Sequence, residues 1–322
     1  MPETFNIRSE GRVEIIEFDN PPMNFINLEM LKELRLELLR VRGDEGVRVL
    51  VLTGGMEGSF LTHYEVPSLI EYSEKSRLKA TGLLPAAALY GLIRLMNRFP
   101  GLESRVLALT RGQSPGEQGI MLWSAVIEHL DTMPKPVIAA ISGLSLGGGC
   151  EISLCCDIRY MARGDGYVIG LPEVGIAIIP GGTGTPFRLA RVVGEATALE
   201  MLLTEKMYTA DEAQAAGLIH KAMYPDELMP ATMQLAERLA SGAPLAQRAA
   251  KADLRRGSRL SYTMGRITDL AVASRAVFSD DARMAMKRYV EILSGHTSFD
   301  AKALLADIEE QLDSSDFGFT GS

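Results

Sequence analysis

The sequence predicts an α/β fold in which most strands of the central sheet run parallel. Two observations lead to this prediction. In the first half of the chain, apolar β-rich segments alternate with segments whose apolar residues recur at helical spacing, as is typical of strand–helix–strand units. From Pro186 onward, strand signals become scarce and helical patterns dominate. We therefore expect an α/β core at residues 1–195, with a helical insertion at about residues 71–131, followed by a helical region with an acidic tail at residues 196–322.

The predicted core begins with a strand at residues 12–18, where alternating apolar residues end at the turn sequence Asp19-Asn20-Pro21-Pro22. Asn27 can then cap a helix in which leucines recur at positions 28, 31, 34 and 38. A short buried helix is expected at residues 150–156. Further apolar runs predict buried strands at residues 47–53, 137–141 and 158–162.

Helical patterns account for most of the remaining chain. Residues 71–131 hold at least two such patterns around a polar loop at residues 110–119, which fits either a helical flap over the core or plain surface decoration. After His296, apolar residues at helical spacing predict a tail that docks on its own chain or on a neighbour and frays after residue 314. Helices are also predicted at residues 187–193, 196–203, 210–216, 227–239, 245–255 and 282–293.

Composition restricts the class of protein. The 322 residues include 33 Lys and Arg against 41 Asp and Glu, a net charge of −8, which argues against general nucleic-acid binding. The 3 cysteines cannot form a disulfide framework and point to a reducing cytosol. The N-terminus is polar, and no uncharged apolar run reaches the length of about 18 residues that a membrane span needs. We expect a cytoplasmic enzyme, or its inactive relative, that binds neither nucleic acid nor membrane.

The most informative segment is KPVIAAISGLSLGGGCEISLCCD, at residues 135–157. A buried strand leads into Gly147, Gly148 and Gly149, which open a helix whose free N–H groups face negative charge. The segment lacks both the spacing of a dinucleotide fingerprint and the Gly-Lys-Ser/Thr of a phosphate loop. These donors therefore suit an oxyanion that forms during a reaction. Glu151, in the first helical turn, fits either a catalytic carboxylate or one placed for the helix dipole.

A second carboxylate, Glu173, lies in the sequence GLPEVG, where apolar neighbours would raise its pKa toward a value useful in proton transfer. The alternative is a carboxylate satisfied by a backbone N–H group in a loop of Gly and Pro. The following sequence at residues 181–184, GGTG, resembles a phosphate cradle but lacks a lysine and a suitable preceding strand. We expect a tight turn there.

The third segment is the loop at residues 58–66, which leaves the strand at residues 47–53 and can present backbone N–H groups. Its His63 fits either a base or a structural histidine. The cysteines have no metal-ligand spacing, so they are expected to be small core residues and no metal site is predicted. Arg188, Arg191, Arg255 and Arg256 are expected on solvated faces.

Together, and in this order, these segments resemble the enoyl-CoA hydratase/isomerase (crotonase) superfamily. The likeness covers nearly the whole chain apart from residues 71–131 and the tail after His296. The supporting sequences are NPPMN at residues 20–24, VRVLVLTG, the loop around Phe60, KPVIAAISGLSLGGGCE, LPEVGIAIIPGG and TADEAQAAGLIHKAMYPDEL.

The resemblance implies a crotonase-like spiral of ββα units and a helical C-terminal region that builds trimers, often paired into hexamers. It also implies an acyl-thioester substrate, carried by coenzyme A or an acyl-carrier protein, and no metal or other cofactor. Two backbone N–H groups, matching Thr62 and Gly148, would form an oxyanion hole. Glu151 and Glu173 match the two glutamates that handle the water and the α-proton in family hydratases. Candidates for the substrate pocket are Leu61, His63, Tyr64, Gly147, Pro172 and Lys251.

The function expected from this resemblance is a 2-enoyl-thioester hydratase or dehydratase that passes through an enolate of the thioester. The alternatives are an isomerase, a decarboxylase or a thioester hydrolase of the same superfamily, or a non-catalytic partner with this fold. Three departures from the family pattern bear on the substrate: His63 and Glu65 replace the usual Gly and Asp, the turn after Pro180 is one residue longer, and residues 71–131 are enlarged. The last suggests an unusual or bulky acyl group.

Overall fold

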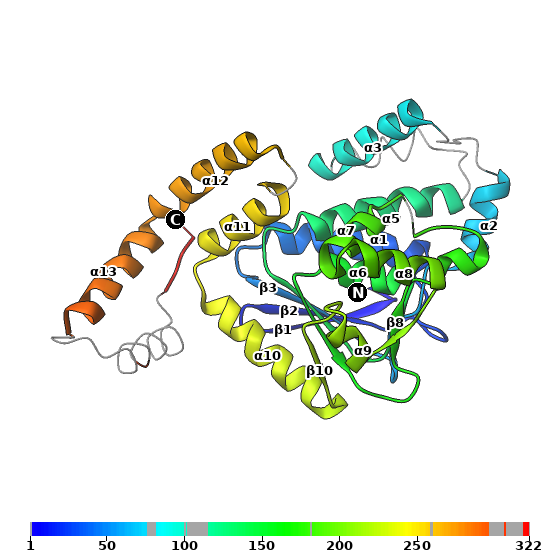
Figure 1. The fold of residues 1–322 in the computed structure, drawn as a ribbon, viewed down its shortest axis with the longest axis horizontal. Helices are drawn as coiled ribbons and strands as arrows, with labels where there is room; N and C mark the ends of the chain where they lie inside the picture. Colours follow the sequence, from blue (N-terminus) through cyan, green and yellow to red (C-terminus); the bar gives the residue numbers. More distant parts are fainter. Residues whose placement is uncertain are drawn as a thin grey trace.

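The computed structural model describes residues 2–75, 82–99, 101, 115–180, 182–257, 260–295, 306 and 318–321. Its core is a pair of sheets with helices around them (Figure 1). The six-stranded sheet has the order β1 (Phe5–Glu10), β2 (Val13–Phe18), β3 (Val49–Gly54), β5 (Val137–Ile141), β7 (Ile158–Ala162) and β10 (Lys221–Met223). The four-stranded sheet has the order β4 (Ser59–Leu61), β6 (Leu144–Leu146), β8 (Val168–Gly170) and β9 (Tyr208–Thr209).

The prediction of a mostly parallel sheet is confirmed. Among the strands of the described residues, the β1–β2 and β8–β9 pairs are antiparallel and the other pairs run parallel. All four predicted strands form within two residues of their expected starts. The sequence pattern does not predict β1, because five of its six residues are exposed on an edge strand and carry no apolar alternation.

Alternation along the central strands explains why the six-stranded sheet is covered on both faces. In β3, Leu50 and Leu52 pack into one cluster and Val49 and Val51 into another. The first cluster lies under α1 (Leu28–Gly43), α5 (Pro115–Asp131) and α6 (Gly148–Cys155), and the second lies against α10 (Pro225–Ser241). Figure 1 shows α10 and α1 on opposite sides of these strands.

The boundary expected at residue 195 is wrong. Both β9 and β10 come from beyond it, and each is an edge strand of one of the two sheets. These strands are two and three residues long, too short for a recognisable alternation. Because α10 also covers a sheet face, the α/β core continues to about the end of that helix. Between β8 and β10 lie α7 (Thr185–Val193), α8 (Glu195–Thr204) and α9 (Ala210–Ala215).

The expected helical insertion is only in part an addition to the core. It contains the end of α2 (Val66–Lys75), all of α3 (Leu83–Arg98) and all of α5. Leu122, Trp123 and Val126 of α5 are core residues, so this helix is a core element and not part of a flap. By contrast, α3 buries only Ile93 and Met96. The loop expected at residues 110–119 is partly replaced by the start of α5, and its residues 110–114 lie outside the described part.

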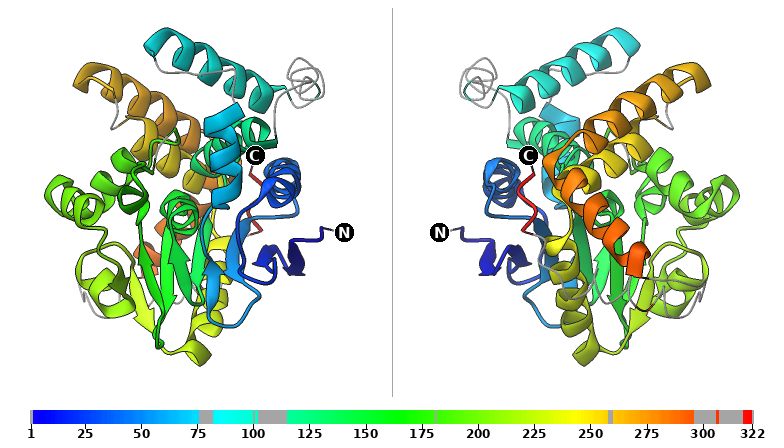
Figure 2. Two further views of the ribbon diagram at one scale, coloured as in Figure 1. Left: turned by 90° about the vertical axis from the view of Figure 1, so that its right-hand side faces the viewer. Right: turned by 90° about the vertical axis from the view of Figure 1, so that its left-hand side faces the viewer.

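The C-terminal helices are α11 (Pro244–Ala252), α12 (Tyr262–Val277) and α13 (Asp280–Gly295). They project from the sheets as a separate arm, as Figures 1 and 2 show. Most of the predicted tail lies outside the described residues. Residues 318–321, expected to fray, instead return to the body: Arg48 Nη2 donates to Phe319 O at 3.0 Å, and Gly321 N–H donates to Asp281 Oδ2 at 2.8 Å. None of the described helices has the length and apolar character that crossing a membrane requires.

Candidate active site

The candidate site is built around the start of α6, where the chain turns sharply out of β6. Gly147 has φ +49°, in the left-handed region that favours glycine. Its N–H donates to Gly170 O at 2.9 Å, and Leu146 N–H donates to Thr62 O at 3.0 Å. These bonds fasten the first turn of α6 between the loop after β8, which carries Glu173, and the loop after β4.

The glycine run lets these loops approach closely. A Cβ on Gly149 would lie 2.2 Å from Leu61 O. A Cβ on Gly147 would lie 2.8 Å from Glu173 Oε1 and 3.2 Å from His63 Cβ. The structure therefore brings Glu173 and His63 to the start of the helix that carries Glu151.

Glu151 is buried and firmly held. Its Oε2 accepts hydrogen bonds from Thr183 Oγ1, at 2.6 Å, and from Thr185 Oγ1. Burial raises the pKa of Glu151, while the two threonine hydroxyls and the charge of Arg188 act in the opposite direction. These donors favour the ionised carboxylate.

Glu173 is in a contrasting environment. It begins a 3₁₀ turn (Glu173–Ile176) directly after Pro172, and its Oε2 is enclosed with no hydrogen-bond partner among the described residues. Burial, together with the charge of Glu151, raises the pKa of Glu173 to about 7. The pKa of each carboxyl group is raised, but the two differ in their partners: hydroxyl donors favour the ionised form of Glu151, whereas Glu173 Oε2 has no donor among the described residues.

The expected oxyanion donor Thr62 needs correction. Thr62 N–H donates to Asn24 O at 3.2 Å, so this donor is already used inside the fold. The N–H of Tyr64 is instead placed at the site: a Cβ on Gly148 would lie 3.3 Å from Tyr64 N. Neither Tyr64 N–H nor Gly148 N–H has an acceptor among the described residues. The pair of free donors next to the carboxyl groups is therefore Tyr64 and Gly148.

The other predicted pocket residues differ in how close they come to the site. His63 lies beside it, with its ring 4.8 Å from that of Phe25 and Nδ1 2.8 Å from Tyr64 O. Pro172 is half-buried and precedes Glu173. Leu61 is fully buried and backs α6 from within the core.

Two residues not predicted from the sequence, Ile26 and Trp123, pack against the first turn of α6. A Cβ on Gly148 would lie 2.8 Å from Ile26 Cδ1 and 3.4 Å from Trp123 Cη2. Trp123 also lies 6.2 Å from the Tyr64 ring, measured between ring centroids. The one available signal was that Trp123 is the only tryptophan in the chain.

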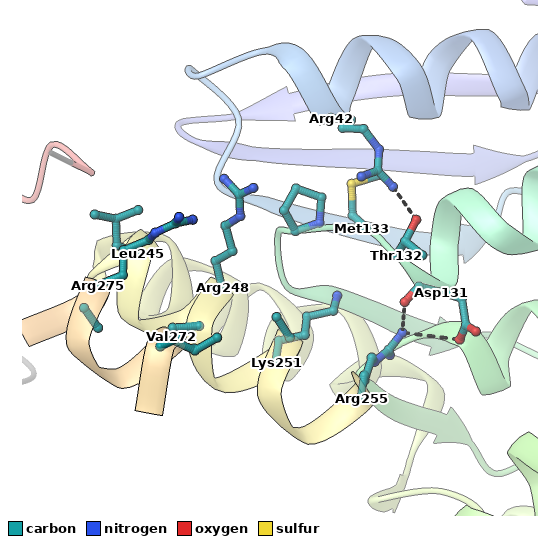
Figure 3. A pocket seen from close by; sticks show the side chains of 15 residues that line it. Arg42, Asp131, Thr132, Met133, Leu245, Arg248, Lys251, Arg255, Val272 and Arg275 are labelled. Atoms are coloured by element: carbon teal, nitrogen blue, oxygen red, sulfur yellow. Dashed lines mark hydrogen bonds and ion pairs between the residues drawn. The ribbon is translucent and has the colours of Figure 1, made fainter. Parts of the chain in front are cut away.

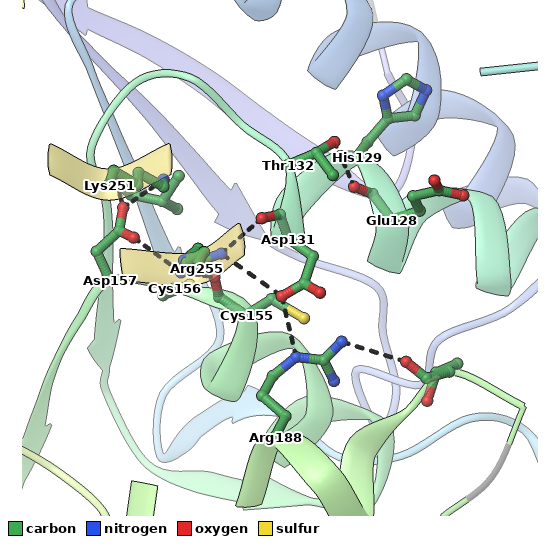
Figure 4. Close-up of polar contacts among 12 residues, drawn as sticks. Glu128, His129, Asp131, Thr132, Cys155, Cys156, Asp157, Arg188, Lys251 and Arg255 are labelled. Carbon is green, nitrogen blue, oxygen red and sulfur yellow. Dashed lines mark hydrogen bonds and ion pairs between the residues drawn. The ribbon is translucent and has the colours of Figure 1, made fainter. Parts of the chain in front are cut away.

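The expectation of solvated arginines is wrong for Arg188 and Arg255. Arg188 is only 8% exposed; its Nε donates to Asp131 Oδ1 at 3.1 Å, and Arg255 Nη1 donates to Asp131 O at 2.8 Å. Figure 4 shows the resulting chain of contacts from Arg188 through Asp131 and Arg255 to Asp157. Arg191 is exposed, as expected, and the side chain of Arg256 lies outside the described part.

Lys251 is not brought to the candidate site. Its Nζ donates to Lys135 O at 2.8 Å and to Asp157 Oδ2 at 2.5 Å, at the end of α6 opposite Gly147. It lines a hollow of about 390 Å³ between α11 and the ends of α1 and α5 (Figure 3). Two of the arginines there bind carbonyl oxygens at the C-terminal ends of helices. Arg42 donates to His129 O of α5, and Arg255 donates to Cys155 O of α6.

The described residues include no group of three or more His, Cys, Asp or Glu side chains that could hold a metal ion. All 3 cysteines are buried and free, as expected.

A family model, described as enoyl-CoA hydratase/isomerase, matches residues 109–298. This chain belongs to the enoyl-CoA hydratase/isomerase family. It is 29% identical over 286 residues to a short-chain-enoyl-CoA hydratase from Clostridium acetobutylicum, covering 88% of this chain and 94% of that protein. It is 32% identical over 252 residues to an (E)-benzylidenesuccinyl-CoA hydratase from Thauera aromatica, covering 78% of this chain and 81% of that protein.

The fold agrees with this assignment. A crystal structure of an enoyl-CoA hydratase from Bacillus anthracis superposes with a TM-score of 0.71, at 25% identity, and covers 90% of this chain and 96% of that one. The predicted family and crotonase-like fold are confirmed.

Proposed function

We propose that this protein is a hydro-lyase that adds water across the α,β double bond of 2-enoyl-CoA thioesters. The observation that carries the proposal is that two carboxyl groups, Glu151 held by two hydroxyl donors and Glu173 with a pKa raised to about 7, lie beside the free N–H groups of Tyr64 and Gly148. A hydratase needs a base for water, an acid for the α-carbon and donors for the thioester oxygen.

Glu151 takes the role of the base. Its ionised carboxylate accepts a proton from water as the water oxygen bonds to the β-carbon of the substrate. The electron pair of the double bond moves toward the thioester carbonyl, whose oxygen becomes enolate-like. Glu173, protonated near neutral pH, then transfers its proton to the α-carbon and completes the addition. The reverse sequence removes water.

The N–H groups of Tyr64 and Gly148 stabilise the enolate oxygen. Both are backbone donors that lie close together and have no acceptor among the described residues. A donor of this kind contributes about 3 kcal/mol to transition-state stabilisation. Because backbone dipoles supply this stabilisation, the proposed chemistry requires no metal or other cofactor.

Coenzyme A as the carrier is supported by the relatives, which are named as hydratases of CoA thioesters. A cytoplasmic location and a homotrimer, or a hexamer of two trimers, remain our predictions. The exposed apolar side chains of Leu270 on α12, Phe278 directly after it and Val290 on α13 suit such an assembly because water would otherwise cover them. Light scattering on the purified protein tests the oligomeric state.

Hydration of crotonyl-CoA, followed by loss of the enoyl-thioester absorbance and by mass spectrometry of the product, tests the function. Glu151→Gln and Glu173→Gln should each lower kcat by about 10²-fold or more. Glu195→Gln is the matched control, since Glu195 also lies in the first turn of a helix but is exposed. Hydration that survives both active-site changes excludes this mechanism, and a panel of longer and aryl enoyl thioesters then defines the acyl group.

A further inference from the structure

The segment after Pro180 places two hydroxyl groups on the carboxylate of Glu151. Thr183 Oγ1 and Thr185 Oγ1 both bond to Oε2, and they lie 2.9 Å from each other. We propose that Thr183 and Thr185, oriented by Arg188, are positioning residues that hold Glu151 ionised and leave its other oxygen for water. This inference rests on the role of Glu151 proposed above.

The two hydroxyl groups favour the ionised form of Glu151. An ionised carboxylate is acceptor-only, so both threonine hydrogens can point at Oε2. A hydrogen bond to a charged acceptor is stronger than one to a neutral acceptor, so two donors on one oxygen stabilise the anion more than the acid. Both bonds act to lower the pKa of Glu151, against the burial that raises it.

Arg188 determines which way the hydroxyl of Thr185 points. Arginine carries only donors, and Arg188 Nη1 lies 3.4 Å from Thr185 Oγ1, while its Nη2 donates to Thr183 O at 3.2 Å. Because the guanidinium takes a lone pair of Thr185 Oγ1, the hydrogen of that hydroxyl points away from Arg188. Glu151 Oε2 and Thr183 Oγ1 are both in reach of it, and the carboxylate is the stronger acceptor because it is charged. Arg188 Nε donates in turn to Asp131 Oδ1, and this ion pair fixes the position of the guanidinium beside Thr185.

Local backbone geometry brings the threonines to this place. Thr185 is the first residue of α7, preceded by Gly184 with φ +79° and followed by a proline. The positive φ of Gly184 turns the chain sharply just before α7, so the Thr185 side chain at the start of this helix points at Glu151 on α6. The other carboxylate oxygen, Oε1, accepts no hydrogen bond from a described residue, so it is the one available to water.

The test compares valine with serine at both positions. Thr183→Val/Thr185→Val keeps the side-chain shape and removes both hydroxyls, whereas Thr183→Ser/Thr185→Ser keeps the hydroxyls and loses the methyl groups. In the valine variant, we expect the acidic limb of the kcat/KM profile to move up by about one pH unit and kcat to fall about tenfold to hundredfold, with KM little changed. The serine variant should behave like wild type in both respects.

Thr53→Val is the matched control. Thr53 is also buried, but its hydroxyl donates to a neutral backbone carbonyl, Ala140 O, at 2.9 Å. Its loss should lower stability without moving the pH limb. The single variant Thr183→Val, at a less buried position, serves if the double valine variant does not fold.

If the threonines have a purely structural role, the serine variant should lose as much activity as the valine variant, and the acidic limb should not move. This outcome overturns the inference. A second readout separates it from the proposed function. Infrared titration of the Glu151 carboxylate, assigned by subtracting the spectrum of Glu151→Gln, needs no substrate. If wild type hydrates no enoyl thioester, the proposed function fails, while a higher Glu151 pKa in the valine variant still supports the positioning role and an unchanged one refutes it.

Discussion

Gly147 makes room for the carboxyl group of Glu173, because a Cβ at residue 147 would lie only 2.8 Å from Glu173 Oε1. Since Gly147 also has φ +49°, a side chain there is both crowded and strained. The position that opens the catalytic helix thus also determines where the proposed acid can sit.

Gly147→Ala should therefore displace Glu173 and lower kcat by about 10²-fold, the usual loss when one group in acid–base catalysis is misplaced. The strained backbone adds a destabilisation of about 1–3 kcal/mol. Steady-state kinetics and thermal unfolding of the same preparation measure the two effects. Gly166→Ala is the control: Gly166 has a similar positive φ, with open space around its Cβ position, so it should lose stability but not activity. Equal kcat losses in both variants would contradict the steric argument.

The raised pKa of Glu173 predicts how stability changes with pH. A carboxyl group whose pKa is about 7 when folded, against 4.5 as its ordinary value, keeps its proton in the native state and loses it in the unfolded state as pH rises between these values. The native state then binds more protons, so the stability contributed by this group falls with rising pH. Glu173→Gln removes the effect. The variant should match wild type below about pH 4 and exceed it by up to about 3 kcal/mol near pH 8, with a smaller gain where solvent screens the group.

Denaturant titrations at both pH values measure this difference. No gain for Glu173→Gln at the higher pH would mean that Glu173 is not protonated in the native state.

The same protonation predicts the activity profile. Hydration requires the acid form of Glu173, so kcat/KM should fall as pH rises through about 7. Dehydration uses the enzyme form with the proton on Glu151 and the charge on Glu173, which binds the same total number of protons. Because the overall reaction neither takes up nor releases a proton, its kcat/KM should fall over the same pH range. Comparing the residual activity of Glu173→Gln with wild type tests the assignment: the fall near pH 7 should disappear, and a basic limb that stays in place would rule it out.

Gly148→Ala tests the backbone donors. The new Cβ would approach Ile26 Cδ1 to 2.8 Å and Tyr64 N to 3.3 Å, which covers the space between the two N–H groups. We expect kcat to fall by about 10²–10³-fold, as for removal of one oxyanion donor. Adding Ile26→Val removes the clashing Cδ1 but leaves the Cβ beside Tyr64, so it should restore stability and not activity. Recovery of both would show that the defect was only crowding.

Asp281 links the end of the chain to the C-terminal arm. It is only 3% exposed, and its two carboxylate oxygens accept the N–H groups of Thr320 and Gly321 at 2.9 and 2.8 Å. Asp281→Asn leaves one of these N–H groups facing an amide donor and should cost about 1–3 kcal/mol. We expect faster proteolytic removal of the final residues, measured by mass spectrometry. Asp280→Asn, at an exposed neighbour, should have no such effect.

The local elements of this protein could largely be predicted because each depends on neighbours in the sequence. Asn27 caps α1 through a bond from Met30 N–H to its side chain, an interaction spanning three residues. The alternation in β2 and β3 predicts two buried faces before any partner is known. Local patterns do not predict contributions from distant segments. For this reason the sequence does not predict β9 and β10, and the predicted core ends before these two strands.

The same distinction between local sequence and distant contacts applies to the residues of the candidate site. By itself, the sequence determined the glycine run, the two glutamates and their place in the family, since each is a matter of residue type and spacing along the chain. Only the tertiary structure decided that Tyr64 and not Thr62 offers a free N–H, that Lys251 lies elsewhere, and that Arg188 is buried behind Glu151. Other segments of the chain decide whether an N–H group already has an acceptor and whether a charged side chain is buried. These contacts form only when the chain packs into its tertiary structure.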